Sequence, residues 1–382
     1  MTQETKIPFN RPSIVGKEFD YIRQAVSASH ISGDGPFTKR CQQLLEETLG
    51  VSRAFLTTSC THALEMAALL LDINPGDEVI VPSFTFVSTV NAFILRGAKP
   101  VFIDIRPDTL NMDESQLEAL ISPKTKAIVP VHYAGVGCEM EAICRIASQH
   151  GVPVVEDNAQ GLFGKYKERY LGTHGVLATQ SFHESKNLTC GEGGALLINE
   201  EQYVERAEII REKGTDRTQF LRGQVDKYTW RDVGSSYLPS DLLAAFLFAQ
   251  LEARESIQAA RKRIWEIYWE ELHEWAQEKQ VQLPRVPSYC EQTYHMFYLL
   301  LPSLEKRSEF IGFLKERGIR CVFHYQPLHL APMGRRWGCQ AGDFPVTEDI
   351  SDRLVRLPFY NELSPADQER VCEAVREAGQ AW

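Results

Sequence analysis

From about residue 50 onward, short apolar and β-branched runs alternate with segments whose apolar residues recur every three or four positions. This alternation predicts a largely parallel sheet covered by helices, because parallel strands need a crossover and are buried on both faces. The predicted strands cover residues 78–81, 100–104, 127–132, 152–157, 179–183 and 195–199. The predicted helices between them cover residues 61–71, 115–121, 140–150 and 200–213. An α/β core is therefore expected.

The pattern changes after Asp241, where a long helical stretch rich in Ala, Glu, Arg and Trp runs to about Glu278. Pro284 and Pro287 then interrupt the chain. A second α/β segment follows, with predicted strands at 296–301 and 320–325 and predicted helices at 306–317 and 365–379. We therefore predict a large domain at residues 1–250 and a smaller C-terminal domain at residues 251–382.

The composition narrows the classes of partner. The formal net charge of -10 disfavours binding to nucleic acid or anionic membranes, so small molecules are the expected partners. Residues 1–10 lack a basic stretch followed by an apolar run, and no apolar run is long enough to cross a bilayer, so we expect a cytoplasmic protein. The nine cysteines include no C-x-x-C pair, and Pro327 separates His324 from His329. We therefore expect no disulfide framework and no metal site.

One predicted strand, residues 152–157, is apolar and then ends in Glu156 and Asp157, followed by Asn158 and Gln160. The carboxyl ends of strands in parallel α/β sheets are where ligands bind, so a carboxylate is well placed there. Taken alone, the two acids also suit the capping of a turn.

Lys186 lies between the next predicted strand, 179–183, and the glycine-rich run 191–194, which allows a tight return into strand 195–199. A single lysine in a loop is normally solvated. Combined with the acid-ended strand upstream, however, it supplies what pyridoxal phosphate (PLP) requires. Lys186 would form the Schiff base, and Asp157 would keep the pyridine nitrogen protonated.

The other requirements of PLP can also be assigned. The phosphate needs amides and hydroxyls at a helix N-terminus, and Ser59, Cys60 and Thr61 lead into the predicted helix 61–71. The ring needs an aromatic or apolar face, which Phe86 would supply. Each residue alone also suits a plain helix cap or the core, and the prediction depends on their order and spacing.

Five stretches resemble the DegT/DnrJ/EryC1/StrS family of sugar aminotransferases. They are residues 82–89 (PSFTFVST), 154–160 (VVEDNAQ), 181–194 (SFHESKNLTCGEGG), 211–216 (REKGTD) and 324–329 (HYQPLH). The resemblance implies a fold-type-I PLP-dependent aminotransferase that forms a homodimer with composite sites. It also implies that Gln160 contacts the cofactor ring, and that Ser181 and the amides of Cys60 and Thr61 hold the phosphate.

Two positions depart from the family pattern. Ser59-Cys60-Thr61 stands where the family usually has Ser-Gly-Thr, so the phosphate turn must form without that glycine. Ser236 stands where the family commonly has an asparagine that contacts the phosphate in the neighbouring subunit. Ser236 is the shorter hydroxyl substitute expected at this cofactor contact.

The runs 222–238 and 323–329 resemble the subgroup that transfers the amino group of L-glutamate to C4 of dTDP-4-dehydro-6-deoxy-glucose for enterobacterial common antigen synthesis. We expect basic residues of segment 211–237 to meet the phosphates of cofactor or nucleotide, although a solvated surface would also explain them. The expected substrate contacts are His183, Arg231, His324, Tyr325 and His329.

Two alternative functions remain open. The protein could be an aminotransferase for a different nucleotide keto-sugar (3-keto, UDP- or GDP-linked), or a non-catalytic PLP-binding regulator. Lys186 argues against a dehydratase of this family, which would lack the Schiff-base lysine.

Overall fold

The computed structural model describes residues 6–381. The strands of the central sheet are β1 (Arg53–Thr57), β2 (Glu78–Pro82), β3 (Lys99–Ile103), β4 (Thr125–Ile128), β5 (Val155–Asp157), β8 (Leu177–Ser181) and β9 (Gly194–Ile198). They form two groups, ordered β3-β2-β4 and β5-β8-β9-β1, which parallel bridges from Ile128 to Val154 and from Val131 to Asp157 join. Only β9 runs antiparallel to its neighbours. The sheet is therefore mostly parallel, as predicted.

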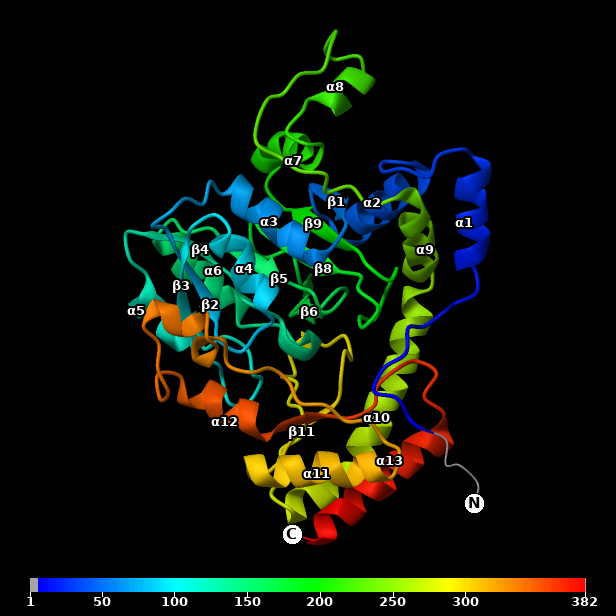
Figure 1. Cartoon of the computed structure of the whole chain (residues 1–382), viewed down its shortest axis with the longest axis vertical. Coiled ribbons are helices and arrows are strands. Elements are labelled where there is room, and N and C mark those ends of the chain that lie inside the picture. Colours follow the sequence, from blue (N-terminus) through cyan, green and yellow to red (C-terminus); the bar gives the residue numbers. More distant parts are fainter. Residues whose placement is uncertain (1–5, 382) are drawn as a thin grey trace.

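Helices cover both faces of this sheet (Figure 1). They are α1 (Glu18–Ser27), α2 (Pro36–Leu49), α3 (Cys60–Leu70), α4 (Val87–Ile94), α5 (Leu117–Leu120), α6 (Met140–Gln149), α7 (Val204–Arg211), α8 (Arg217–Leu221) and α9 (Asp241–Glu252). Leu196 and Ile198 of β9 pack in one core with α3, α4 and α7, whereas Ala195 and Leu197 pack in another with α2 and α9. Alternate side chains of a strand point to opposite faces, so β9 is buried along its whole length.

The C-terminal part of the chain has a core of its own. Its elements are α10 (Arg254–Glu278), β11 (Tyr298–Leu300), α11 (Leu304–Glu316), α12 (Pro345–Arg353), β12 (Leu354–Arg356) and α13 (Pro365–Ala378). Tyr268, Phe297, Leu314 and Val371 are buried together there, with Ile7 from the start of the chain. Figure 1 shows α10 descending from α9 to this region. A small antiparallel sheet of β10 (Cys290–Glu291), β6 (Lys165–Tyr166) and β7 (Arg169–Tyr170) connects the two parts.

Several predicted boundaries need correction. The long helical stretch is two helices, because Ala253 leaves the helical conformation (φ -89°, ψ 7°) between α9 and α10. Residues 320–325 do not form a strand. Among them only Val322 pairs, with Arg356, and residues 322–326 line a cavity at the edge of the sheet. Several elements were not predicted: the helices α1, α2, α4, α8 and α12, and the strands β1, β6, β7, β10 and β12. The division into two domains at residue 250 stays a prediction.

Across residues 6–381, no helix is both long and apolar enough to span a membrane. Within the same residues, no group of three or more His, Cys, Asp and Glu side chains is arranged to hold a metal ion.

Candidate active site

The carboxyl ends of β5 and β8 open into a cavity of about 780 Å³. The open ends of parallel strands are where α/β proteins bind ligands. Eleven of the predicted site residues line this cavity: Ser59, Cys60, Thr61, Phe86, Asp157, Gln160, Ser181, His183, Lys186, His324 and Tyr325. The structure therefore brings together residues that lie as far apart in the sequence as Ser59 and Tyr325.

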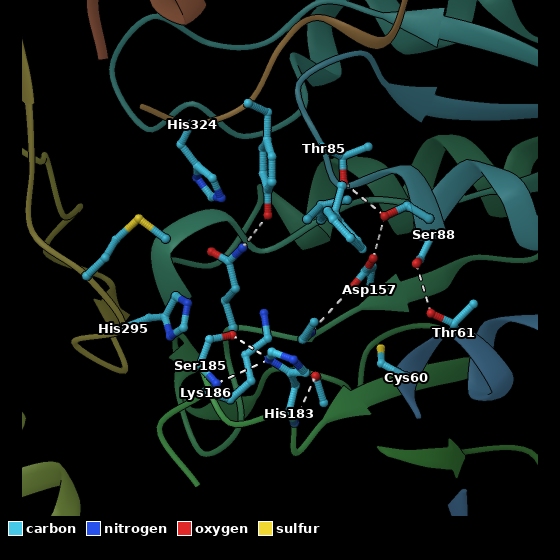
Figure 2. Close-up of a pocket in the computed structure, with 18 of the residues that line it drawn as sticks. Cys60, Thr61, Thr85, Ser88, Asp157, His183, Ser185, Lys186, His295 and His324 are labelled. Carbon is cyan, nitrogen blue, oxygen red and sulfur yellow. Dashed lines mark hydrogen bonds between the residues drawn. The ribbon is translucent and has the colours of Figure 1, made fainter. Parts of the chain in front are cut away.

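Lys186 stands in the loop that follows β8. Figure 2 shows its amine pointing into the space between Asp157 and His295. Among the described residues, the Lys186 Nζ atom has no hydrogen-bond or ion-pair partner. Burial lowers the pKa of Lys186 below its usual 10.5, and the nearby Cys60 and Asp157 oppose this shift only in part. The amine is thus held available for covalent chemistry.

Asp157, the last residue of β5, is buried at the cavity wall. Its Oδ2 atom accepts a hydrogen bond from Thr89 Oγ1 at 2.7 Å, and its Oδ1 atom accepts one from the Ala159 amide at 3.2 Å. Thr89 is itself bonded to the hydroxyl of Thr85 at 2.9 Å. These donors orient a carboxylate that can still accept a hydrogen bond from a cationic ligand group.

The N-terminus of α3 forms the third feature of the cavity. Ser59 Oγ accepts a hydrogen bond from the His62 amide at 3.1 Å, which leaves the amides of Cys60 and Thr61 without acceptors inside the helix. A Cβ at Gly194 would lie 2.4 Å from Cys60 N, so β9 must carry a glycine beneath this turn. Unpaired amides at a helix start form an anion site that suits a phosphate.

Cys60 occupies the phosphate turn without backbone strain, because none of residues 59–61 has a positive φ. The missing glycine is therefore not needed for the turn to form. Burial, reinforced by the charge of Asp157, raises the pKa of the Cys60 thiol, so the thiol stays protonated.

Comparison with known proteins identifies this arrangement. Residues 12–376 match the DegT/DnrJ/EryC1/StrS aminotransferase family. The GDP-perosamine synthase of Escherichia coli O157:H7 is 32% identical over 372 residues, which cover 97% of this chain and 98% of that protein. The chain belongs to this family. It is a PLP-dependent aminotransferase, as predicted, and the side chains at Lys186, Asp157 and the start of α3 fit the cofactor's amine, pyridine and phosphate requirements.

Solved structures agree with this assignment of the aminotransferase. The PLP form of the putative sugar aminotransferase Spr1654 from Streptococcus pneumoniae is 25% identical, with a TM-score of 0.91 and coverage of 99% of both chains. DesV of S. venezuelae, solved in complex with a ketimine intermediate, is 28% identical, with a TM-score of 0.89 and coverage of 98% of this chain and 99% of that one. The predicted fold-type-I class is confirmed.

In the aminotransferase, Gln160 and Phe86, the predicted ring contacts, both line the cavity. Gln160 Oε1 accepts a hydrogen bond from the Ala134 amide at 2.7 Å, and its Nε2 donates to the Tyr325 hydroxyl at 3.1 Å. Phe86 remains 56% exposed, and its ring centroid lies 6.3 Å from that of Tyr325. An exposed aromatic ring at the mouth of the cavity is free to cover a flat ligand ring.

Two histidines in the cavity wall are neutral. His324 Nδ1 bonds the Tyr133 hydroxyl at 2.9 Å, and burial lowers the pKa of His324 well below 6.5. Burial lowers the pKa of His295 in the same direction. His295 Nδ1 lies 2.8 Å from Asn187 Oδ1 and must donate to it, because the Asn187 amide nitrogen already donates to Thr293 O and Gln258 Oε1. This assignment leaves His295 Nε2 as a hydrogen-bond acceptor.

His295 and Arg356 also line the cavity, although no sequence pattern predicts either of them there. His295 follows Thr293 and Tyr294, and Arg356 stands in the apolar run Leu354-Val-Arg-Leu-Pro358. Neither context carries a catalytic motif. Only the packing of the C-terminal part against the sheet places them near Lys186.

Three predicted site residues lie away from this cavity. His329 is fully buried, and both its ring nitrogens are used, Nδ1 with Ser83 Oγ at 2.7 Å and Nε2 with Glu348 Oε1 at 3.1 Å. Its prediction as a substrate contact is therefore corrected to a packing role. Arg231 and Ser236 are exposed on the segment around α8 and do not line the cavity of their own chain.

Most of the basic charges predicted to meet phosphates are balanced within the chain. The ion pairs are Lys213 and Arg217 with Glu212, Arg222 with Glu208, and Arg231 with Asp216. The buried Arg211 pairs with Asp34. The segment is therefore less available to phosphate groups than its sequence suggests, because an anion must compete with these carboxylates.

Proposed function

We propose that this aminotransferase moves the amino group of L-glutamate to C4 of dTDP-4-dehydro-6-deoxy-D-glucose and gives dTDP-4-amino-4,6-dideoxy-D-galactose. This is the reaction of the dTDP-4-amino-4,6-dideoxygalactose transaminase of enterobacterial common antigen synthesis, which residues 222–238 and 323–329 resemble. The observation that carries the aminotransferase assignment is the half-buried, unpartnered Lys186 amine in one cavity with the Asp157 carboxylate. We place this reaction in the cytoplasm.

Lys186 performs the proton transfers of both half-reactions. Its lowered pKa makes the neutral amine more accessible at physiological pH, so Nζ can take the proton from the α-carbon of glutamate. In the second half-reaction the same amine delivers a proton to C4 of the sugar. The Lys186 amine can serve both half-reactions because it lies beside the reacting carbon in each of them.

Bound PLP supplies a ring that withdraws electrons from the reacting carbon and carries the amino group between the two substrates. Asp157 supports this chemistry by keeping a proton on the pyridine nitrogen, and Thr89 and Ala159 fix the direction of its carboxylate. The amides of Cys60 and Thr61, with Ser181, hold the phosphate. Gln160, fixed by the Ala134 amide, positions the ring.

The sugar is expected to bind against the part of the cavity wall that residues 323–326 form. His324 and Tyr325 present neutral hydrogen-bonding groups there. His183, whose side chain is 43% exposed at the cavity, can reach a sugar hydroxyl. A cavity of about 780 Å³ is within the range that buries a ligand larger than the cofactor alone.

A GDP-linked 4-keto-6-deoxy sugar is the second candidate substrate, because the relative in E. coli O157:H7 at 32% identity is a GDP-perosamine synthase. The test is a competition between dTDP-, UDP- and GDP-linked 4-keto-6-deoxy sugars with glutamate as the donor, and NMR gives the configuration of the product. Preference for dTDP with an axial 4-amino group supports the first candidate. Preference for GDP, or an equatorial amino group, favours the second and leaves the aminotransferase unchanged.

We also propose a homodimer with composite active sites. The segment around α8 projects from the body of the molecule (Figure 1). It exposes large apolar side chains, with Leu221 at 67%, Tyr228 at 53% and Trp230 at 78%. Such a projecting apolar segment suits burial against a second copy of the chain, where Ser236 would reach the other copy's phosphate site. Sedimentation at assay concentrations tests this proposal, and active monomers would contradict it.

A further inference from the structure

Arg356 brings a guanidinium group to the cavity from its C-terminal wall. It is the last residue of β12, where it pairs with Tyr298 of β11. On its other side, the Arg356 amide donates to Val322 O at 2.8 Å, and the Val322 amide donates to Arg356 O at 3.2 Å. Backbone bonds on both sides therefore fix the position from which this side chain extends.

The guanidinium is only partly satisfied. It lies 4.7 Å from the centre of the Phe9 ring, and its Nη2 atom donates to Phe323 O at 3.2 Å. Its Nε atom is buried without a hydrogen-bond partner. Among the described residues no carboxylate lies within ion-pair distance of Arg356, whereas Arg353, three residues earlier, pairs with Asp349. Arg356 is thus a half-buried cation without a counter-charge.

The surroundings do not supply the missing negative charge. His295 and His324 are neutral, and the charge of Arg356 contributes to the lowered pKa of each. It also contributes to the lowered pKa of Lys186, so Arg356 is within electrostatic range of the reactive amine. A partly buried cation left unpaired costs free energy, part of which an anionic ligand group would recover.

We propose that Arg356 binds the α-carboxylate of the amino-acid donor and that this wall of the cavity is the donor's carboxylate subsite. The inference rests on the proposed aminotransferase reaction with glutamate. A planar guanidinium matches the two oxygens of a carboxylate. The α-carboxylate is attached to the carbon from which Lys186 takes its proton, so it must bind close to that amine. The cofactor phosphate is accounted for separately by the α3 terminus.

This subsite has a consequence for the two half-reactions. The amino donor carries a carboxylate on its reacting carbon, and the ketone of the sugar does not. Arg356 should therefore act in the donor half-reaction and contribute little to the transfer of the amino group to the sugar.

The test compares the wild-type holoenzyme with Arg356→Met, Arg356→Lys and the matched control Arg353→Met. Calorimetry measures binding of glutarate, an unreactive dicarboxylate, and of dTDP. Steady-state kinetics give the KM for glutamate, and single turnovers of the amino-loaded enzyme with the keto-sugar isolate the second half-reaction. Arg356→Met should weaken glutarate binding and raise the KM for glutamate by about 10- to 100-fold, with single turnovers unchanged. Arg356→Lys should recover part of the loss, and Arg353→Met should match wild type.

Unchanged glutarate affinity and unchanged KM in Arg356→Met would overturn the inference and leave the proposed function intact. Loss of dTDP affinity with glutarate binding unchanged would also overturn it, by assigning Arg356 to the nucleotide. A wild-type enzyme that neither binds glutarate nor accepts glutamate would instead refute the proposed function and the subsite with it.

Discussion

The two walls of the cavity are built in different ways. One wall comes from the ends of adjacent parallel strands, where Asp157 ends β5 and Lys186 stands in the loop after β8. The other comes from connecting segments of the C-terminal part and carries His295, His324 and Arg356. On the strand wall the carboxylate has two fixed donors, whereas on the C-terminal wall the guanidinium has a buried nitrogen without a partner. On the proposed function, the strand wall would hold the resident cofactor and the C-terminal wall would bind the substrates.

The largest effect is expected at Lys186. Lys186→Ala removes the amine that moves both protons, so turnover should fall by at least about 10³-fold. The visible absorbance that borohydride traps in the wild type should also disappear. Lys165→Ala is the control, because Lys165 pairs with Glu291 outside the cavity. A borohydride-labelled peptide that contains Lys165, Lys167 or Lys213 would contradict the assignment.

A smaller loss is expected at Asp157. Asp157→Asn keeps the size of the side chain and removes the charge that holds the pyridine proton. We expect kcat to fall by about 10²- to 10³-fold, while borohydride still labels Lys186. Steady-state kinetics measure kcat, and borohydride labelling of the same sample reports whether Lys186 still reacts with the cofactor. Near-normal turnover would show that the Asp157 charge is not needed to keep the pyridine nitrogen protonated.

The adjacent acid, Glu156, provides a contrast within one strand. Its carboxylate is fully buried and accepts hydrogen bonds from His132 Nε2 and from the amides of Gly172, His174 and Gly175, all between 2.7 and 2.8 Å. Burial alone would raise the pKa of Glu156, but the His132 hydrogen bond and the other nearby donors and charges outweigh it and lower the pKa. Glu156 therefore fixes the loop behind the strand wall.

Glu156→Gln should consequently cost stability more than activity. We expect the free energy of unfolding to fall by about 3 kcal/mol at pH 7, because one amide cannot accept all four bonds. A lowered folded-state pKa means that the ionised acid stabilises the fold above its ordinary pKa of 4.5, and that this contribution is lost as the pH falls below that value. Denaturant unfolding at several pH values measures both effects. A stable but inactive variant would contradict this division of roles.

The sequence predicted the strand wall well for a physical reason. Strand ends in a parallel sheet meet along one edge, so an acid at the end of residues 152–157 and a lysine after residues 179–183 had to lie close together. Six of the seven strands of the central sheet, all but β1, and helix α3 could be predicted from local periodicity. The division of residues 241–278 into two helices could not be predicted, because Ala253, where they separate, is itself a good helix former.

The C-terminal wall was only partly predictable. His324 and Tyr325 were identified from their motif, but the same motif suggested His329, which packing turns away from the cavity toward Ser83 and Glu348. Arg356 and His295 stand in apolar surroundings that indicate core. Their position depends on the pairing of β11 with β12 and on contacts across more than a hundred residues, which no local pattern encodes.

The smallest expected effect concerns the neutral histidines of the C-terminal wall. Burial lowers the pKa of His324 well below 6.5, so the folded protein keeps the ring neutral while the unfolded chain binds a proton as the pH falls through 6.5. The unfolded state then holds more protons, and stability present above pH 6.5 is lost below it, by up to about 1.4 kcal/mol per pH unit for one group. In His324→Gln the decline of unfolding free energy between pH 6.5 and 5 should be shallower by about this amount. His273→Gln, at a half-buried position on α10 away from the cavity, should leave the decline unchanged. Equal declines in wild type and His324→Gln would mean that the ring is protonated in the folded state, and the C-terminal wall would then carry more positive charge than Arg356 alone supplies.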